Sequence, residues 1–91
     1  MLIQHEENGN EGKFYLEQSG EELAEMTYTI NNGKMVIDHT EVAESLRGKD
    51  IGFQLVEHGV EYAREQNLKI VPVCEYAQKV LQTTEEFQDV L

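Results

Sequence analysis

The stretch Leu46-Arg47-Gly48-Lys49-Asp50-Ile51-Gly52-Phe53 decides the fold that we expect for this chain. It lies between an apolar-alternating segment at 35–42 and a segment at 53–66 whose apolar residues recur at helical spacing. A strand, a glycine-bearing turn and a helix start bring free backbone N–H groups to the positive end of a helix dipole. Such a turn is a general way to hold phosphate, so we expect an anion-binding turn here.

The residues before this turn follow the two-residue period of β-strands. Apolar and polar residues alternate from Leu23 to Ile30, and Asn31-Asn32-Gly33 is typical of a tight hairpin turn because Asn and Gly tolerate positive φ. The short connections predict an antiparallel meander. Four strands are expected, over residues 2–6, 13–17, 23–30 and 34–42.

The residues after the turn change to a helical period. A helix is expected over 53–66, with Gly59 at a point of close approach between helix and sheet. Residues 68–74 form a short, β-branched apolar run that predicts a buried strand, with Pro72 at an edge, at a bulge or where strands part. A second helix is expected over 75–82, and the last residues add a strand or a turn.

The expected order is four strands, helix, strand and helix, in one domain spanning residues 1–91. The strand–helix–strand unit from Met35 to Cys74 needs a parallel, right-handed crossover. The sheet must therefore be mixed, although mostly antiparallel. The predicted fold class is α+β, with an α/β-like β-α-β unit around the turn.

The same residues resemble the GNAT family of acetyltransferases. Arg47 and Gly52 stand at the ends of an R/Q-x-x-G-x-G/A pattern, which is the acetyl-CoA-binding motif of that family. The order Asp38-His39-Thr40-Glu41-Val42, then the turn, then Ile70-Val71-Pro72-Val73-Cys74 is similar to the minimal GNAT-like proteins, which lack the N-terminal helices of full-size members. The resemblance covers about Tyr28 to Leu81 and implies a minimal GNAT fold.

The resemblance also implies acetyl-CoA as the cosubstrate. Gly48 and Gly52 leave no Cβ in the way of a pyrophosphate, and Arg47 adds positive charge. In the family the pantetheine arm lies along the preceding strand, so the backbone of residues 41–42 would meet it. The residues expected to bind the cofactor are Val42, Arg47, Gly48, Lys49, Asp50, Ile51, Gly52 and Phe53.

One position departs from the family pattern, because Asp50 stands where the motif has its central glycine. A carboxylate beside a pyrophosphate is repulsive unless it points into solvent or caps the following helix, which would stabilise that helix by about 1 kcal/mol. Asp tolerates positive φ better than most residues, so the backbone shape is expected to survive. Replacing Asp50 with glycine is expected to tighten CoA binding and to make the helix slightly less stable.

Four residues are candidates for acetyl transfer to an amine. His39 and Glu41 share one strand face, where either is placed to take a proton from an ammonium group; the alternatives are a structural hydrogen bond for His39 and an exposed strand end for Glu41. The resemblance implies a thioester near Cys74, whose thiol is then a general acid, an acetylated nucleophile or simply a small buried hydrophobe. Tyr76 loosely matches a tyrosine that protonates the leaving group in full-size members, and packing is its alternative.

The composition limits the partners. A net charge of −11 argues against nucleic acid or an anionic membrane as the main partner, and it is compatible with a cationic acceptor or with solubility alone. The one cysteine excludes an internal disulfide, which is typical of a reducing, cytoplasmic setting. The start of the chain has no signal-peptide pattern, and no apolar run approaches the ~20 residues of a membrane span. The three histidines lack metal-ligand spacing, so no metal site is expected.

The sequence therefore predicts a small, cytoplasmic N-acetyltransferase that transfers an acetyl group from acetyl-CoA to a primary amine of a small molecule or protein. The first alternative is a non-catalytic module on the same scaffold that binds CoA, acetyl-CoA or another protein. The second is a structural domain without a cofactor. The acceptor is not predicted, and both a monomer and a homodimer that completes the site are compatible with the sequence.

Overall fold

The computed structural model describes residues 2–91, and its strands form one five-stranded sheet. The first four strands make an antiparallel meander, and the fifth pairs in parallel with the fourth. The expected mixed, mostly antiparallel sheet is confirmed. In chain order and in sheet order the strands are β1 (Gln4–Asn8), β2 (Glu11–Gln18), β3 (Glu21–Asn31), β4 (Lys34–Val42) and β5 (Lys69–Pro72).

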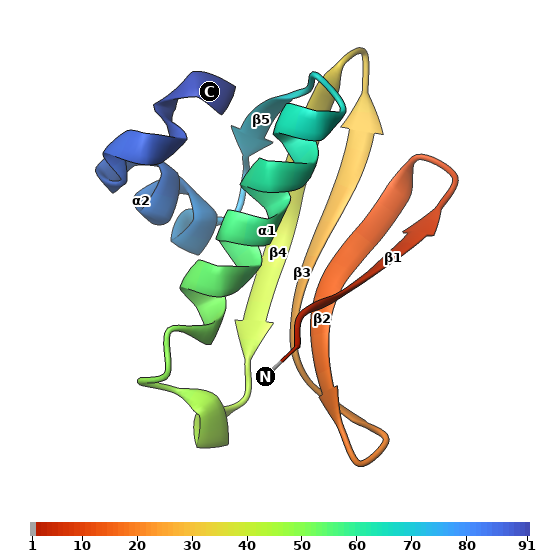
Figure 1. Cartoon of the computed structure of the whole chain (residues 1–91), viewed down its shortest axis with the longest axis vertical. Coiled ribbons are helices and arrows are strands. Elements are labelled where there is room, and N and C mark those ends of the chain that lie inside the picture. The colour runs from red at the N-terminus through yellow and green to blue at the C-terminus, as the bar shows by residue number, and fades with distance from the viewer. Residues whose placement is uncertain (1) are drawn as a thin grey trace.

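The helices lie together on one face of this sheet (Figure 1). α1 (Ile51–Glu65) connects β4 to β5, and α2 (Glu75–Thr83) follows β5, as expected. Two short 3-10 helices complete the chain, η1 (Glu44–Leu46) before the turn and η2 (Glu85–Val90) at the end. The last residues therefore form a helical turn and not the strand that was the other expectation, because Phe87 and Val90, three residues apart, are both buried.

The core lies between α1 and the strands beneath it. Met26 and Met35 from the sheet and Leu55 from the helix are fully buried. Gly59 faces this layer: a Cβ at that position would lie 2.8 Å from the terminal methyl of Met26. The expected close approach of helix and sheet at Gly59 is confirmed, and it holds the middle of α1 against the sheet.

The other face of the sheet is free of helices within residues 2–91 (Figure 1). This corrects one expectation, because the run at 68–74 is only half buried. Ile70 faces the core and is 3% exposed, whereas Val71 and Val73 are 37% and 59% exposed. A strand with one covered face alternates in burial even where its sequence is continuously apolar, so the run was misread as buried on both sides.

An aromatic cluster holds the far end of α1 to the sheet edge. His5 of β1 stacks on Phe14 with ring centroids 4.1 Å apart, and its Nε2 lies 2.6 Å from the hydroxyl of Tyr28. Tyr62 of α1 donates to Glu7 at 2.7 Å. Burial raises the pKa of Tyr28 well above its ordinary value, so this hydroxyl stays protonated in its hydrogen bond with the imidazole. With one end of α1 fixed in this way, the other end sets the position of the glycine turn.

Candidate functional site

The turn before α1 exposes backbone donors. Gly48 and Asp50 both have left-handed backbone, with φ of 84° and 59°. The first hydrogen bond of the helix runs from the N–H of Gln54 to the carbonyl of Asp50 at 3.0 Å. The N–H groups of residues 51–53 therefore have no partner within the helix and point out of its positive end. A turn with left-handed residues that leads into a helix start is suited to an anion.

Asp50 occupies the N-cap position of α1, but its side chain makes no capping hydrogen bond. A capping side chain reaches the first-turn N–H groups from extended backbone, whereas Asp50 is left-handed (φ 59°, ψ 22°). Of the two roles expected for this carboxylate, capping is therefore excluded. The donors of the first turn remain free for a ligand.

A pocket of about 350 Å³ opens beside this turn, between β4, α1 and α2. Six of the eight residues predicted to bind the cofactor line it. The two others lie elsewhere: Lys49 is exposed on the turn, and the ring of Phe53 stacks on Phe87 with centroids 5.6 Å apart. The pocket is lined by Thr40, Val42, Leu46, Arg47, Gly48, Asp50, Ile51, Gly52 and Tyr76.

β4 and β5 part next to the pocket. Their pairing ends at Ile37 and Pro72, and the carbonyl of Ile37 accepts both the N–H of Val73 at 3.0 Å and that of Cys74 at 3.2 Å. Beyond this point β4 continues with β3 alone. Pro72 thus stands where the strands separate, which is one of the three places expected for it.

The separation leaves backbone groups of β4 without a strand partner. The N–H of Ala43 donates to the carbonyl of Leu23 on β3 at 2.7 Å. Because backbone direction alternates along a strand, the polar groups of Glu41 also face β3, whereas those of Thr40 and Val42 face the gap. Of the two backbone positions expected to meet a pantetheine arm, Val42 faces the gap and Glu41 does not.

Cys74 lies at this gap, at the N-cap of α2. Burial tends to raise the pKa of its thiol, but hydrogen bonding of the thiolate by the N–H of Ala77, the Thr40 hydroxyl and the N–H groups of Tyr76 and Thr40 outweighs burial and lowers that pKa. The neutral thiol makes no capping hydrogen bond, and the buried Thr40 Oγ1 has no partner within residues 2–91. These groups therefore act as donors mainly to the thiolate.

Thr40 is a site residue that sequence reasoning missed. A β-bulge places an extra residue, Asp38, in β4, so that Thr27 of β3 pairs with His39 and Tyr28 pairs with Ile37. After the bulge Thr40 turns toward the helices, where it lines the pocket. The only hint in the sequence lay two residues on, because Val42 was expected at the cofactor and alternate residues of a strand share a face; the bulge itself has no reliable sequence signal.

Tyr76 lines the same pocket from the first turn of α2. Its ring lies against Gly52, where a Cβ would be 2.7 Å from the phenol oxygen. Burial, and then the charge of Asp50, raise the pKa of the phenol. At ordinary pH this group is therefore a neutral hydroxyl that can donate a proton but not readily accept one.

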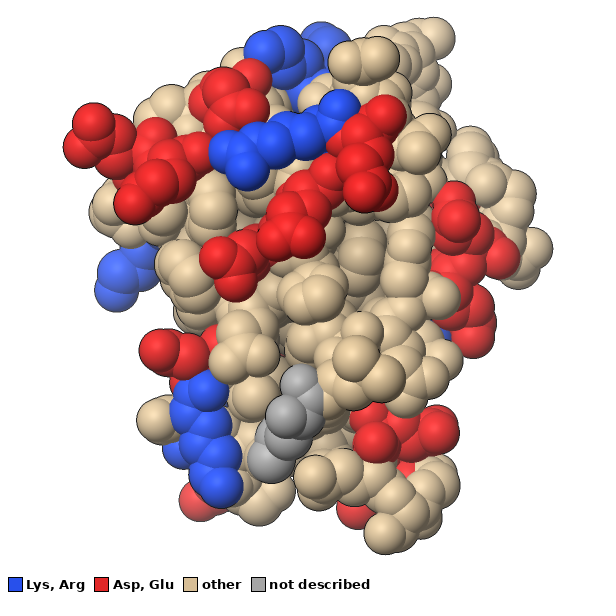
Figure 2. All heavy atoms as spheres, viewed as in Figure 1, with Lys and Arg blue, Asp and Glu red and all other residues tan. Residues whose placement is uncertain are grey.

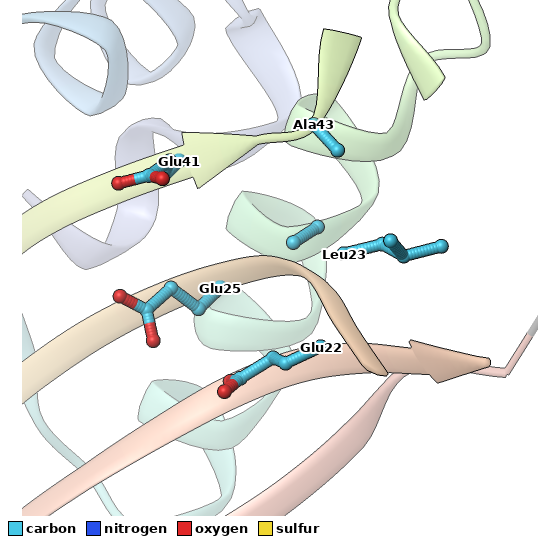
Figure 3. A pocket seen from close by; sticks show the side chains of 6 residues that line it. Glu22, Leu23, Glu25, Glu41 and Ala43 are labelled. Carbon is cyan, nitrogen blue, oxygen red and sulfur yellow. The ribbon is translucent and has the colours of Figure 1, made fainter. Parts of the chain in front are cut away.

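His39 and Glu41 lie on the opposite face of β4. They are hydrogen-bonded at 3.1 Å, which confirms their shared face, and Glu25 is 3.9 Å from the same imidazole nitrogen. Glu41 borders a separate hollow of about 240 Å³, where the carboxylates of Glu22, Glu25 and Glu41 point to the same side (Figure 3). The structure thus brings Tyr76 into the pocket and Cys74 to the neighbouring strand gap, and it leaves His39 and Glu41 across the sheet.

Charge is unevenly distributed around these sites. Figure 2 shows rows of acidic side chains over the helix face, as a net charge of −11 leads one to expect. Basic side chains lie at the lower left of that view, where Figure 1 places the turn before α1. An anion approaching the turn would thus meet local positive charge there, although other basic side chains lie at the top and on the left of the same view.

Neither a metal-binding cluster nor a membrane-crossing helix is found among residues 2–91. No group of three or more His, Cys, Asp or Glu side chains is arranged to hold a metal ion. None of the helices there has the length and apolar character needed to cross a membrane.

Comparison with known proteins identifies the fold and the family. A family model described as GCN5-related N-acetyl-transferase matches residues 13–90. A GCN5-like protein from Staphylococcus aureus is 38% identical and superposes with a TM-score of 0.76, covering 96% of this chain and 85% of that one. No curated protein matches the chain.

Two larger enzymes share the fold at low identity. The ribosomal-protein-S18-alanine N-acetyltransferase of Escherichia coli is 13% identical with a TM-score of 0.70, and 85% of this chain matches 53% of that one. The ribosomal-protein-alanine N-acetyltransferase of Brucella melitensis is 19% identical with a TM-score of 0.66, and 80% of this chain matches 60% of that one. The present chain thus spans a little over half of these enzymes. Given the match over residues 13–90 and the 38% identity, the chain belongs to the GCN5-related N-acetyltransferase family.

Proposed function

We propose that this protein transfers an acetyl group from acetyl-CoA to a primary amine. The observation that carries the proposal is the joined arrangement of an anion-binding turn, a pocket and a strand gap that ends at a thiol with a lowered pKa. Acetyl-CoA supplies an activated acetyl group at the end of a long arm whose other end carries a pyrophosphate. The arrangement offers each part a partner: donors at the turn, a free strand edge at Thr40 and Val42, and Cys74 at the end of the gap.

The binding residues fit such a ligand by their chemistry. The first-turn N–H groups of α1 and the cation of Arg47 suit the pyrophosphate. The backbone groups of Val42 and the carbonyl of Thr40, which face the gap, suit the amides of an extended arm, which would add to β4 as another strand would. A pocket of about 350 Å³ takes only part of a molecule of this size, so the nucleotide end would lie on the surface.

Cys74 is proposed to handle the leaving group. As a general acid, its S–H bond breaks while the sulfur of the departing CoA gains the proton. As a nucleophile, its thiolate forms a bond to the acetyl carbon while the bond from that carbon to the CoA sulfur breaks, and the amine takes the acetyl group in a second step. The lowered pKa of the thiol supports either role, because both need a sulfur that gives up its proton readily.

The base that deprotonates the amine is proposed to be His39, oriented by Glu41. Their hydrogen bond of 3.1 Å fixes the imidazole on the open face of the sheet, and Glu25 adds a second carboxylate 3.9 Å away. From there the proton of an acceptor ammonium is within reach only if the amine enters the gap from this face. The amine and acetyl-CoA would then approach the gap from opposite faces of the sheet.

Binding and turnover test this proposal separately. We expect acetyl-CoA and CoA to bind in titration calorimetry, and a panel of primary amines to yield steady CoA release measured by chromatography. Failure to bind CoA at millimolar concentration would remove the proposal at its first step. The panel should include small amines, polyamines and lysine-containing peptides.

One observation favours a non-catalytic binding module as the second candidate. The carboxylate of Asp50 lies on the left-handed turn itself, bordering the pocket and close enough to raise the pKa of Tyr76. A negative charge there opposes a bound pyrophosphate. CoA binding without turnover of any amine would decide for this candidate.

Replacing Asp50 with glycine is expected to tighten CoA binding about three- to tenfold, because it removes this repulsion. The structure also reverses the expected effect on stability. Since Asp50 does not cap the helix and has a φ of 59°, glycine should raise the free energy of unfolding by about 0.5–1 kcal/mol instead of lowering it.

Calorimetric titration and urea unfolding measure the two effects of this change. Asp50→Asn is the matched control, since it keeps the left-handed residue and removes only the charge. Unchanged CoA affinity in both variants would show that the carboxylate points away from the phosphates.

A further inference from the structure

The contact between Gly52 and Tyr76 joins the two helices that border the pocket. A Cβ at Gly52 would lie 2.7 Å from the phenol oxygen of Tyr76, 2.8 Å from Cζ and 2.9 Å from Cε2. Real Cβ atoms do not approach other atoms so closely, so the ring occupies space that only a glycine leaves open. The second glycine of the turn is therefore needed by the protein's own tyrosine, independently of any bound phosphate.

The position of Tyr76 in α2 gives this contact a consequence. Tyr76 is the second residue of α2, and Cys74 is its N-cap. A side chain at an N-cap meets the N–H groups of the second and third helical residues, which here are Tyr76 and Ala77. The ring that rests on Gly52 is thus attached to the same backbone turn that presents these donors to the sulfur.

The ring does not depend on its hydroxyl to hold this place. No hydrogen bond from the phenol is formed within residues 2–91, and the ring meets Gly52 through carbon atoms as well as oxygen. Tyr76 is also 41% exposed and borders the pocket, so its ring is not required by the core. The contact with Gly52 is therefore what holds the ring of Tyr76 in place.

We propose that Tyr76 is a positioning residue, whose ring packs on the bare Cα of Gly52 and thereby holds the first turn of α2 with its N–H groups aimed at the sulfur of Cys74. The contact links the turn at the start of α1, which is proposed to bind acetyl-CoA, to the thiol of Cys74 at the start of α2. A shift of either helix start would change both. The catalytic consequence of this link rests on the proposed function, but the link itself does not.

The pH dependence of Cys74 alkylation by iodoacetamide tests the link in the full chain without any ligand. Cys74 is the only cysteine, so the loss of thiol, followed by mass spectrometry, reports on one site. The midpoint of the rate against pH gives the pKa of the thiol, whereas the limiting rate at high pH reports how readily the reagent reaches the sulfur.

Gly52→Ala and Tyr76→Ala are each expected to move this midpoint upward, so that the thiolate fraction at a pH below it falls about three- to tenfold. Tyr76→Phe keeps the ring and should keep the wild-type midpoint. The double variant with Ala at both positions should match Tyr76→Ala alone, because no ring is left for the new Cβ to meet.

Gly59→Ala is the matched control, as Gly59 is another buried glycine of α1 whose Cβ would meet only the flexible ends of Met26 and Met35. It should leave the midpoint where it is. A wild-type midpoint in both Gly52→Ala and Tyr76→Ala, or additive shifts in the double variant, would overturn the proposal. If Gly52→Ala does not fold, the comparison of Tyr76→Ala with Tyr76→Phe decides alone.

The outcome is separable from that of the proposed function. A protein that binds no acetyl-CoA would refute the acetyltransferase proposal and still give a clear alkylation profile. In an active enzyme, Gly52→Ala should lower kcat together with the thiolate fraction. If Gly52 served only to bind acetyl-CoA, the same change would alter KM alone.

Discussion

Replacing Cys74 with alanine is expected to lower the kcat of acetyl transfer about 100-fold or more, while the affinity for CoA stays within about threefold of wild type. The reason is the position of the sulfur at the end of the gap between β4 and β5, surrounded by donors from Thr40 and from the start of α2. Neither the turn nor the free edge of β4 depends on this side chain. Steady-state CoA release and calorimetry measure the two quantities.

The two chemical roles of Cys74 give different results in the absence of an acceptor. A nucleophile would gain one acetyl group when the protein is mixed with acetyl-CoA, and mass spectrometry would find it on Cys74. A general acid would remain unmodified under the same conditions. Wild-type turnover in Cys74→Ala would contradict both roles and leave Tyr76 as the proton donor, which Tyr76→Phe then tests.

The fold was predictable because its local signals agree with one another. Alternation from Leu23 to Ile30, the Asn31-Asn32-Gly33 turn and the helical period after Ile51 each point to the element that is found. The structure departs from the prediction in the run at 68–74, because only one face of the sheet is covered by helices. Val71 and Val73 are apolar but exposed, since the face of the sheet that they share has no covering element within residues 2–91.

The site was predictable in part. The turn and Cys74 were recognisable because each lies in a short continuous stretch of sequence, residues 46–53 and 70–74. Both stretches fall within the part of the chain that resembles the family. Thr40 was missed because a β-bulge, which has no reliable sequence signal, sets which face it joins. The contact between Gly52 and Tyr76 was missed for a different reason: it joins residues 24 positions apart, and no local pattern reveals a pair of that kind.

Replacing Gly12 with alanine is expected to lower the free energy of unfolding by about 3 kcal/mol, the largest loss of stability that we predict for so small a change. Gly12 of β2 is the strand partner of Tyr28 of β3, and the phenol lies directly over it. A Cβ would overlap the phenol oxygen, lie 2.5 Å from Cζ and come within 2.8 Å of the backbone carbonyl of Glu6. Thermal and urea unfolding measure the effect.

Neither neighbour of Gly12 is free to move. Tyr28 is 2% exposed and its hydroxyl is hydrogen-bonded to His5, while the carbonyl of Glu6 belongs to the ladder between β1 and β2. A chain of this length has a total stability of roughly 5–13 kcal/mol, so the loss is a large share of it and corresponds to a fall in Tm of about 10–20 °C.

Gly59→Ala separates this steric effect from the general effect of adding a methyl group to a buried glycine. Its Cβ would meet the ends of two flexible methionines, and the gain in helix propensity of about 1 kcal/mol offsets their displacement. We expect its stability to stay within about 1 kcal/mol of wild type. Equal losses in the two variants would mean that β1 and Tyr28 yield as easily as the methionines. The aromatic cluster would then not be what holds the far end of α1 to the sheet, and the position of the turn before α1 would have to depend on the core beneath Leu55 alone.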